Sequence, residues 1–408
     1  MKRPSFGVVT GQGDRNLKVL AIFATLLTAS GAQAAWRIAP TFTLSTTYED
    51  NVRLNEHNED DGTVTVTTAQ VRVSNTTERS GVAADAGVNY RWYSGVDNME
   101  DKDSQFLNLA AGRRSGERSR ISLRGAYTRD TLMRSVRFVP DIDDPDDVPP
   151  GTDDPVDVDE GQSRQQIRRI HYQVSPSWTY RFSERTSGTF GYTYSERQHK
   201  GAQPGFVAVR DSTTQAITAD VRHQFSPVDT LGVSVQATEF DPDNRVESDI
   251  VEVQTGWTRL LSEVTTVEFG IGARRVGSNI DEETGMLYRA SVKRRLNSGS
   301  LSARLERSLY PSSFGEIVET DRVFLRYRQQ LSERWSLRTS VYAMSTESSV
   351  GTNSLRHQDF ARAKVSAQYN LYPGVKLGLN YGYTWVDRKS NAHSTSRNSI
   401  GLSVSYRQ

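Results

Sequence analysis

Segments of about ten residues, in which apolar and polar side chains alternate, recur along the whole chain, and short and long connections join them in turn. In the clearest of them, Val375–Trp385, every second residue is apolar or aromatic. A period of two predicts a strand with one apolar and one polar environment. Many such strands, joined in this way, are typical of a transmembrane β-barrel of a bacterial outer membrane.

The connections predict the number of strands. The short ones carry Gly, Pro, Ser or Asn turn chemistry and are Thr77–Gly81, Arg114–Arg118, Ser183–Arg185, Ser226–Asp229, Leu261–Glu263, Asn297–Gly299, Leu331–Arg334 and Pro373–Gly374. The longer, polar ones are Asn51–Gly62, Asp97–Asp103, Arg137–Ser163, Gln198–Asp211, Asp241–Arg245, Gly277–Thr284, Pro311–Gly315, Glu347–His357 and Asp387–Ser394. These seventeen connections predict an all-β, antiparallel up-and-down barrel of eighteen strands, with sixteen as the alternative because the ends of a periodic pattern are defined least well. A soluble sandwich or propeller does not explain the strict alternation.

The N-terminus predicts export. Lys2, Arg3, Arg15 and Lys18 precede the mostly apolar run Val19–Leu27, and Ala32–Ala34 fits the small-x-small cleavage rule. We expect a signal peptide over residues 1–34 and a barrel over residues 35–408, because an uncleaved anchor would need a longer apolar run.

Aromatic residues predict where the two membrane interfaces lie. Phe182, Phe225, Trp257, Trp335, Tyr372 and Tyr406 lie beside the short turns, and Tyr48, Trp92, Tyr127, Tyr194, Phe240, Tyr288 and Trp385 lie toward the long loops. Two such bands are typical of membrane barrels, so we expect contacts with outer-membrane lipid and lipopolysaccharide and long loops that face outward. The closing segment Ser399–Tyr406 resembles the insertion signal that the barrel assembly machinery reads.

Composition excludes several classes of chemistry. The chain has no cysteine, which rules out disulfide scaffolds, thiol catalysis and cysteine-ligated metals. It also lacks G-x-S-x-G, H-E-x-x-H, P-loop and dinucleotide-binding motifs. We therefore expect no enzyme, no cofactor, no metal centre and no nucleic-acid partner, although a hydrolase assembled from several strands stays as an alternative.

If apolar residues face lipid, the residues between them face the lumen. The inward positive residues are Arg91, Arg120, Arg124, Arg169, Arg181, Arg222, Arg274, Arg289, Lys293, Arg304, Arg322, Arg326, Arg328, Arg338, Arg362, Lys364 and Lys376, and the inward negative ones are Asp85, Asp130, Asp220, Glu252, Glu268 and Glu306. A basic lumen favours anions, and guanidinium groups bind carboxylates. The predicted anion or polysaccharide path consists of Arg120, Arg124, Arg289, Lys293, Arg304, Arg322, Arg326, Arg328, Arg362 and Lys364. The alternative is that these cations pair with the acids and only stiffen the wall.

The connection at residues 137–163 is acidic and rich in proline. Its acidic residues are Asp141, Asp143, Asp144, Asp146, Asp147, Asp153, Asp154, Asp157, Asp159 and Glu160. Such a segment repels itself and buries no core, which favours a disordered surface loop. Two alternatives are an acidic gate over the basic lumen and a divalent-cation site that binds Ca²⁺ or bridges lipopolysaccharide, although the spacing matches no EF-hand.

The segment Tyr48–Leu54 reads Tyr-Glu-Asp-Asn-Val-Arg-Leu. It resembles the Tyr-x-Asp-Asn-Val-x-Leu opening of the outer-membrane β-barrel proteins found with exopolysaccharide and PEP-CTERM sorting loci, also called the β-barrel porin 2 type. The resemblance implies a role in polysaccharide export or surface assembly, with polysaccharide and periplasmic export components as partners. It implies no catalytic residue.

The leading hypothesis is an outer-membrane channel with a basic lumen that exports acidic exopolysaccharide. The alternatives are a general porin or solute-uptake channel, a structural or adhesive surface barrel, and a surface hydrolase.

Overall fold

The computed structural model describes residues 36–56, 59–97, 99–131, 166–201, 209–278, 282–350, 357–388 and 394–407. These residues form eighteen strands. The strands are β1 (Arg37–Glu49), β2 (Gly62–Thr76), β3 (Ser80–Ser94), β4 (Lys102–Ser115), β5 (Ser119–Thr131), β6 (Arg168–Arg181), β7 (Thr186–Lys200), β8 (Ser212–Gln224), β9 (Asp229–Pro242), β10 (Ser248–Ser262), β11 (Thr265–Ser278), β12 (Glu282–Leu296), β13 (Gly299–Pro311), β14 (Ile317–Gln330), β15 (Trp335–Val350), β16 (Gln358–Tyr372), β17 (Val375–Arg388) and β18 (Ser394–Arg407).

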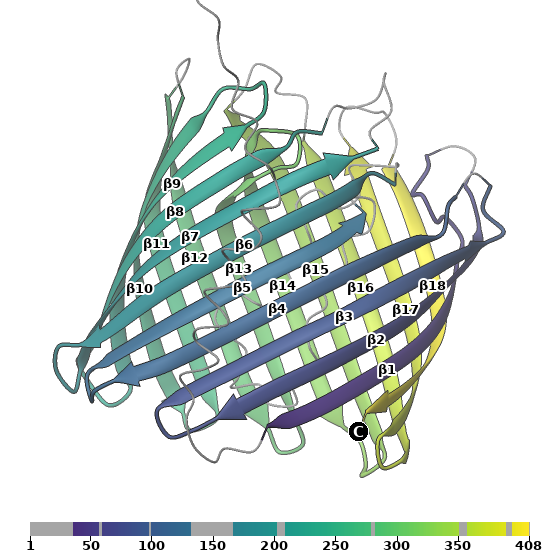
Figure 1. Ribbon diagram of the computed structural model, residues 1–408, viewed down its shortest axis with the longest axis horizontal. Coiled ribbons are helices and arrows are strands. Elements are labelled where there is room, and N and C mark those ends of the chain that lie inside the picture. The colour runs from purple at the N-terminus through teal and green to yellow at the C-terminus, as the bar shows by residue number, and fades with distance from the viewer. Residues whose placement is uncertain are drawn as a thin grey trace, which may run out of the picture.

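The strands close into one antiparallel barrel. Each strand pairs with the next along the chain, and β1 pairs with β18 over Thr41–Glu49, so no edge is left open. Short turns join the strands at the end of the barrel where the chain's C-terminus lies, and longer connections join them at the opposite end (Figure 1). The predicted fold and strand number are confirmed. The strict alternation is not, because β11 ends at Ser278 and β12 begins at Glu282, so most of the long connection predicted at Gly277–Thr284 is strand. At one short turn Gly374 has φ +82°, a left-handed conformation that glycine adopts without strain.

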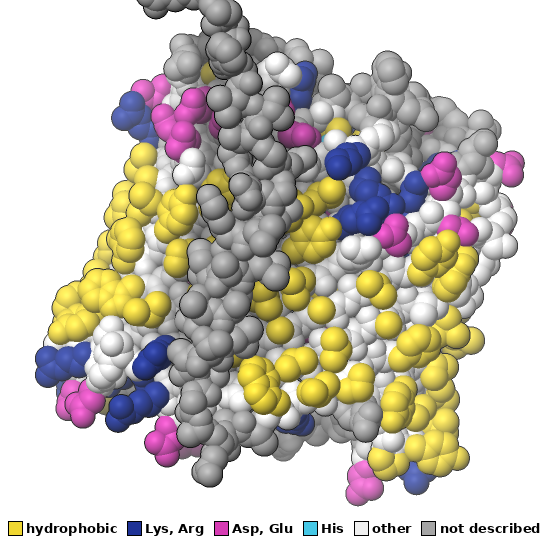
Figure 2. Space-filling model, viewed as in Figure 1, with side chains coloured by type: hydrophobic (Ala, Val, Ile, Leu, Met, Phe, Trp, Pro, Cys, Tyr) yellow, Lys and Arg dark blue, Asp and Glu magenta, His cyan; other side chains and the backbone are white. Residues whose placement is uncertain are grey.

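The outer wall is apolar around its middle. The register of β8, β9 and β10 points Val221, Val233 and Val253 to the same outer face, and all three are exposed. Large exposed apolar side chains occur in this way all around the barrel, and Figure 2 shows them as a band with charged residues above and below. A continuous exposed apolar band indicates a wall that faces lipid. Among the described residues, no helix is long and apolar enough to cross a membrane.

The barrel also has an interior core, at the end with the longer connections. Its largest buried cluster consists of Leu54, Val318, Tyr342, Met344, Phe360 and Val386, and a second consists of Phe240, Ile250, Val276 and Ile317. By register these side chains lie on the inner face of the wall, except Leu54, which lies on a connection, and Ile317, which begins β14 with the outward parity. In this half of the barrel apolar residues therefore face the interior as well as the outer wall, where Val251 and Met286 are exposed.

Phe240 is the clearest correction. The sequence placed it in an interfacial aromatic band, but it is 1 % exposed and packs inside the barrel against Ile250 and Val276. Its neighbours Glu239 and Asp241 have the outward parity instead. The predicted signal peptide and the acidic residues 137–163 lie outside the described residues.

Candidate functional site

The tip of the β13–β14 hairpin leaves the wall and enters the lumen. The pairing of β12 with β13 stops at Tyr288 and Arg307, whereas β13 and β14 stay paired up to Pro311 and Ile317. On the other side β14 stays paired with β15 up to Ile317 and Val350, and β15 also approaches β11 and β12, which are not its hydrogen-bonded neighbours. The wall thus closes behind the hairpin, whose tip is Ser312–Glu316.

Contacts with the far wall hold this tip in place. The guanidinium of Arg197 donates a hydrogen bond to the carbonyl of Pro311 at 2.6 Å, and the amide of Arg210 donates one to the carbonyl of Ser313 at 2.8 Å. Phe314 packs against Ile167. At Gly315, φ is +78° and an added Cβ would lie 3.1 Å from Arg210 and 3.2 Å from Pro242, so the turn needs glycine for its conformation and for space.

Both faces of the hairpin are covered. Leu309, whose register would point it outward in a regular wall, packs against the cluster of Phe240 on β9–β11. From the same face, Glu319 accepts a hydrogen bond from Nε of Arg274 at 2.9 Å. Val318, on the other face, packs among inner residues of β15–β17. The hairpin therefore stands inside the barrel between two arcs of the wall.

The connection between β1 and β2 completes the closure. Most of the segment Tyr48–Leu54 lies in this connection. Asn51 donates a hydrogen bond through Nδ2 to the carbonyl of Asn55 at 2.8 Å, and its Oδ1 accepts one from the amide of Asn55. The backbone amide of Asn398 donates to Asp50 at 2.7 Å. Leu54 has φ +53°, which is costly for a branched side chain, and its buried side chain joins the cluster of Val318. The segment thus docks a loop and has a structural role.

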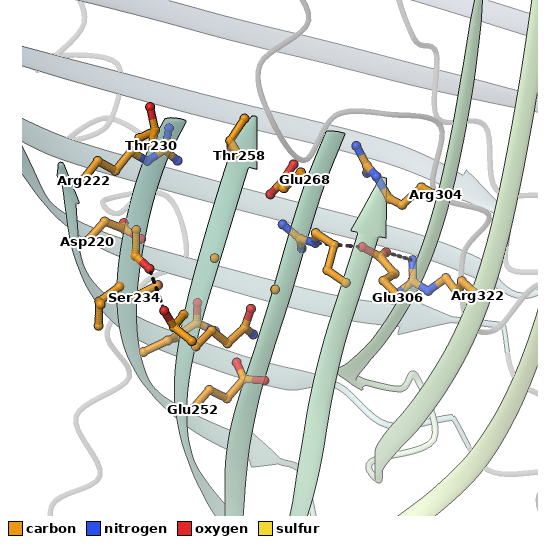
Figure 3. A pocket seen from close by; sticks show the side chains of 18 of the residues that line it. Asp220, Arg222, Thr230, Ser234, Glu252, Thr258, Glu268, Arg304, Glu306 and Arg322 are labelled. Atoms are coloured by element: carbon orange, nitrogen blue, oxygen red, sulfur yellow. Dashed lines mark hydrogen bonds and ion pairs between the residues drawn. The ribbon is translucent and has the colours of Figure 1, made fainter. Parts of the chain in front are cut away.

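A polar cavity of about 640 Å³ lies in the lumen beneath this closure. Tyr310, Phe324 and Tyr342 line it and also belong to or pack against the cluster of Leu54, so they form its ceiling. The charged lining residues are Asp220, Arg222, Glu252, Glu268, Arg289, Lys293, Arg304, Glu306 and Arg322 (Figure 3). The cavity itself is therefore close to charge balance.

These charges are separated around the wall. Asp220, Glu252 and Glu268 lie on β8, β10 and β11 with one cation, Arg222 on β8, whereas four cations lie on β12–β14 around Glu306. Nε of Arg289 lies 3.4 Å and Nη1 of Arg322 lies 3.9 Å from the carboxylate of Glu306, so two cations share one acid. Figure 3 shows Arg322 pointing to Glu306.

The basic region continues beyond the cavity. By register, the inner face of the described strands β14–β18 carries no Asp or Glu, while its cations are Arg322, Arg326, Arg328, Arg338, Arg362, Lys364, Lys376, Arg388, Arg397 and Arg407. Arg328 lies directly opposite Arg338, and Arg114 directly opposite Arg120. Like charges at directly opposed positions destabilise a sheet. These pairs therefore do not contribute to the stability of the barrel, which makes them candidates for a functional role.

All the residues of the predicted anion path lie on inner-face positions. The register brings Arg289, Lys293, Arg304, Arg322, Arg326 and Arg328 together on three neighbouring strands. Arg362 and Lys364 follow on β16, and Arg120 and Arg124 lie apart on β5. Whether anions follow this path stays a prediction. Some predicted inward cations do pair with acids: Arg169 binds Asp130 through Nε at 3.0 Å and Nη2 at 2.8 Å.

The alternation of apolar and polar side chains does not mark the residues that close the lumen. The signal that could have found them is a break in the alternation, as in Val323-Phe324-Leu325 and Val341-Tyr342-Ala343-Met344. Strands that are covered on both faces read as continuous apolar runs. Each of these breaks faces the inward hairpin or the first loop.

The fold resembles that of solved outer-membrane proteins. OccAB4 of Acinetobacter baumannii has 11% sequence identity, with 92% of this chain and 99% of that chain covered and a TM-score of 0.46. OccK2 (OpdF) of Pseudomonas aeruginosa, solved in complex with glucuronate, has 10% identity, 91% and 97% coverage and a TM-score of 0.47. OpdK of P. aeruginosa, solved with vanillate, has 10% identity, 91% and 98% coverage and a TM-score of 0.45. No protein-family model and no curated protein sequence matches the chain.

Proposed function

We propose that this protein is a bacterial outer-membrane channel that lets small anionic solutes diffuse through a basic lumen. The observation that carries the proposal is the inner arc of β14–β18, where the inner-face register positions of the described strands hold Arg and Lys and no Asp or Glu. Arg388 and Arg397 at the edge of this arc pair with Glu56 and Glu49, and Glu319 of the inserted hairpin binds Arg274, so the unbalanced cations lie toward the short turns. In a confined, low-dielectric wall, such a one-sign arc raises the local concentration of anions and disfavours cations.

The closure at the long-loop end favours small solutes. The hairpin tip and the first loop fill part of the mouth with packed apolar side chains, so a solute must pass beside them or displace them. A flexible polymer would have to thread the same opening. The channel is therefore closer to a solute-uptake porin than to an open export conduit.

Export of an acidic exopolysaccharide, which the resemblance of Tyr48–Leu54 implies, is the narrower version of this proposal. It uses the same basic wall, because guanidinium groups bind uronic-acid carboxylates, but it requires the hairpin to leave the mouth. Acidic polysaccharide added to one side should then block the current only when the mouth can open.

The test is the reversal potential of the refolded full chain in a planar bilayer under a KCl gradient. An anion-selective current is expected. A cation-selective current, or the absence of any conductance, would contradict the proposal. Block by alginate in the same experiment, compared with neutral dextran, would support the polysaccharide version.

A further inference from the structure

We propose that the inserted hairpin is a movable part of the wall. Its segment Ser308–Pro311 leaves the lumen and pairs with the edge of β12 at Thr284–Leu287, and this movement opens the mouth. The inference rests on the proposed function, because it names how that channel would open. It goes further in assigning the two strand edges that meet, the side chains that hold the hairpin inside and the point about which it turns.

The edge of β12 beside the hairpin has no strand partner. Tyr288 is the last residue of β12 that pairs with β13, although β12 stays paired with β11 beyond it. On the side away from β11, Thr284–Leu287 pairs with none of the described strands, and β15 approaches β12 without pairing with it. Membrane barrels normally pair the amide and carbonyl groups of every edge. This edge is therefore a vacant position in the wall.

The register already present fills this edge without a shift. Tyr288 lies opposite Arg307, so the same register continued along both strands places Met286 opposite Leu309. Met286 is exposed on the outer wall, and Leu309 has the outward parity, so both would face lipid. In the inserted position Leu309 packs against the apolar cluster of β9–β11 instead. The alternation of β13 thus fits a regular wall as well as an inserted hairpin.

Three polar side chains lie where the hairpin leaves the wall. Nε of Arg307 donates a hydrogen bond to the carboxylate of Asp321 on β14 at 2.7 Å, and the hydroxyl of Tyr288 donates one to the same oxygen at 2.8 Å. The guanidinium carbon of Arg307 lies 5.3 Å from the centre of the Tyr288 ring. These contacts join β12, β13 and β14 at one level, so the cluster is the pivot of the movement.

Arg274 holds the hairpin inside. Its Nε donates a hydrogen bond to Glu319 of β14 at 2.9 Å, and its Nη2 donates one to Glu283 of β12 at 2.9 Å. An added Cβ at Gly285 would lie 2.7 Å from this guanidinium, so Arg274 lies against the vacant edge. Without Arg274, Glu319 would be left with Glu347, a like charge directly opposite on β15. The inserted position is therefore the more stable one, and the wall position is the minor, open state.

Introduced disulfides can report the two positions, because the chain has no cysteine. Met286→Cys with Leu309→Cys joins residues that lie on opposite sides of the wall in the inserted position and opposite each other in the wall position. In liposomes this pair should crosslink under copper phenanthroline. In planar bilayers the crosslink should trap a larger conductance, which a reductant returns to the narrow one. Ile167→Cys with Phe314→Cys, whose native side chains pack together, should trap the narrow conductance.

Three controls define the crosslinking rates. Ala290→Cys with Leu305→Cys is the positive control, because these residues lie directly opposite each other on the outer face in both positions. Met286→Cys with Val323→Cys is the negative control, because both are exposed on the outer wall but Val323 lies on β14, opposite Leu305. Leu309→Cys alone measures the effect of the lost packing on the current.

Arg274→Gln should speed the crosslinking of Met286→Cys with Leu309→Cys about tenfold or more, because it removes charge-assisted hydrogen bonds to Glu319 that only the inserted position makes. The matched control is Arg275→Gln. Arg275 is the next residue of β11, faces outward and lies 2.7 Å from Glu282 in an exposed ion pair. Exposed pairs contribute little, so the rate should not change.

Crosslinking of the Met286–Leu309 pair that is no faster than that of the Met286–Val323 pair would overturn the movement. So would an unchanged conductance after crosslinking, or equal rates in Arg274→Gln and Arg275→Gln. The two proposals fail separately, because crosslinking is measured without current. A protein that crosslinks but never conducts loses only the channel, and an anion-selective channel whose Met286–Leu309 pair does not form loses only the movement.

Discussion

Two halves of the same lumen carry different chemistry. Toward the long connections, the inner face presents Phe240, Met344 and Phe360, which pack around a hairpin inserted from the wall. Toward the short turns, the same face presents Arg328 and Arg338 directly opposite each other. One half is organised by burial and the other by charge. If the protein is the channel proposed above, we expect the first half to set the width of the path and the second half to set which ions it prefers.

The strongest way to break this comparison is to remove the inserted tip. Replacing residues 312–316 with a two-residue Asn-Gly turn should raise single-channel conductance several-fold, because the tip no longer fills the mouth. Ion selectivity should stay anionic, because the charged half is untouched. A conductance equal to that of the unmodified chain would mean that the hairpin does not narrow the path.

A charge placed in each half should have unequal consequences. Met344 and Ser340 lie on the inner face of β15, but only Met344 belongs to the buried cluster. An uncompensated charge at Met344→Arg costs about 3–5 kcal/mol when buried, which should expel the hairpin and raise conductance toward that of the turn variant. Ser340→Arg should keep the narrow conductance. Similar currents from the two variants would show that the halves do not differ.

A milder change tests the contact between the first loop and the hairpin. Leu54→Ala should weaken the docking by about 2–5 kcal/mol, because it leaves a cavity beside Val318. Recordings should then show brief openings to a larger conductance. Leu44→Ala is the matched control, because Leu44 is exposed on the outer wall. Recordings of this variant should show no openings to the larger conductance. Quiet recordings from both variants would place the gate elsewhere.

The barrel could be predicted from the sequence because its wall obeys a local rule. Alternation fixed the facing of Arg326 and Lys364 without any knowledge of their neighbours, and turn chemistry marked the short connections. The facing of each side chain could therefore be predicted wherever one face of the strand is polar and the other contacts lipid.

The closure could not be predicted because it depends on contacts between residues far apart in sequence. Phe314 packs against Ile167, and Leu54 packs against Val386. A pattern with period two tells which side of the wall a residue faces, not that another segment covers that side. For the same reason the sequence predicted Arg322 on the lumen face but not its stacking on Tyr310.

The smallest expected effect, and the sharpest for the charged half, concerns selectivity alone. Changing Arg326, Arg328 and Arg338 together to Gln should move the reversal potential under a KCl gradient toward zero. It should not change sign, because Lys293, Arg304 and Lys376 remain on the inner face.

The salt concentration provides a second test of this prediction, because dissolved ions screen the charges of the inner face. The Debye length falls from about 10 Å at 0.1 M salt to about 3 Å at 1 M, so the difference between the triple variant and the unmodified chain should shrink as salt rises. Arg113→Gln removes a cation whose register points it outward, opposite Ile121, and should leave the reversal potential unchanged at every concentration. Equal shifts from Arg113→Gln and from the triple change would mean that net charge, and not the inner arc, sets the preference for anions. A shift in reversal potential that does not depend on salt would instead indicate that the triple variant changes the width of the path. The charged half and the packed half would then not act independently.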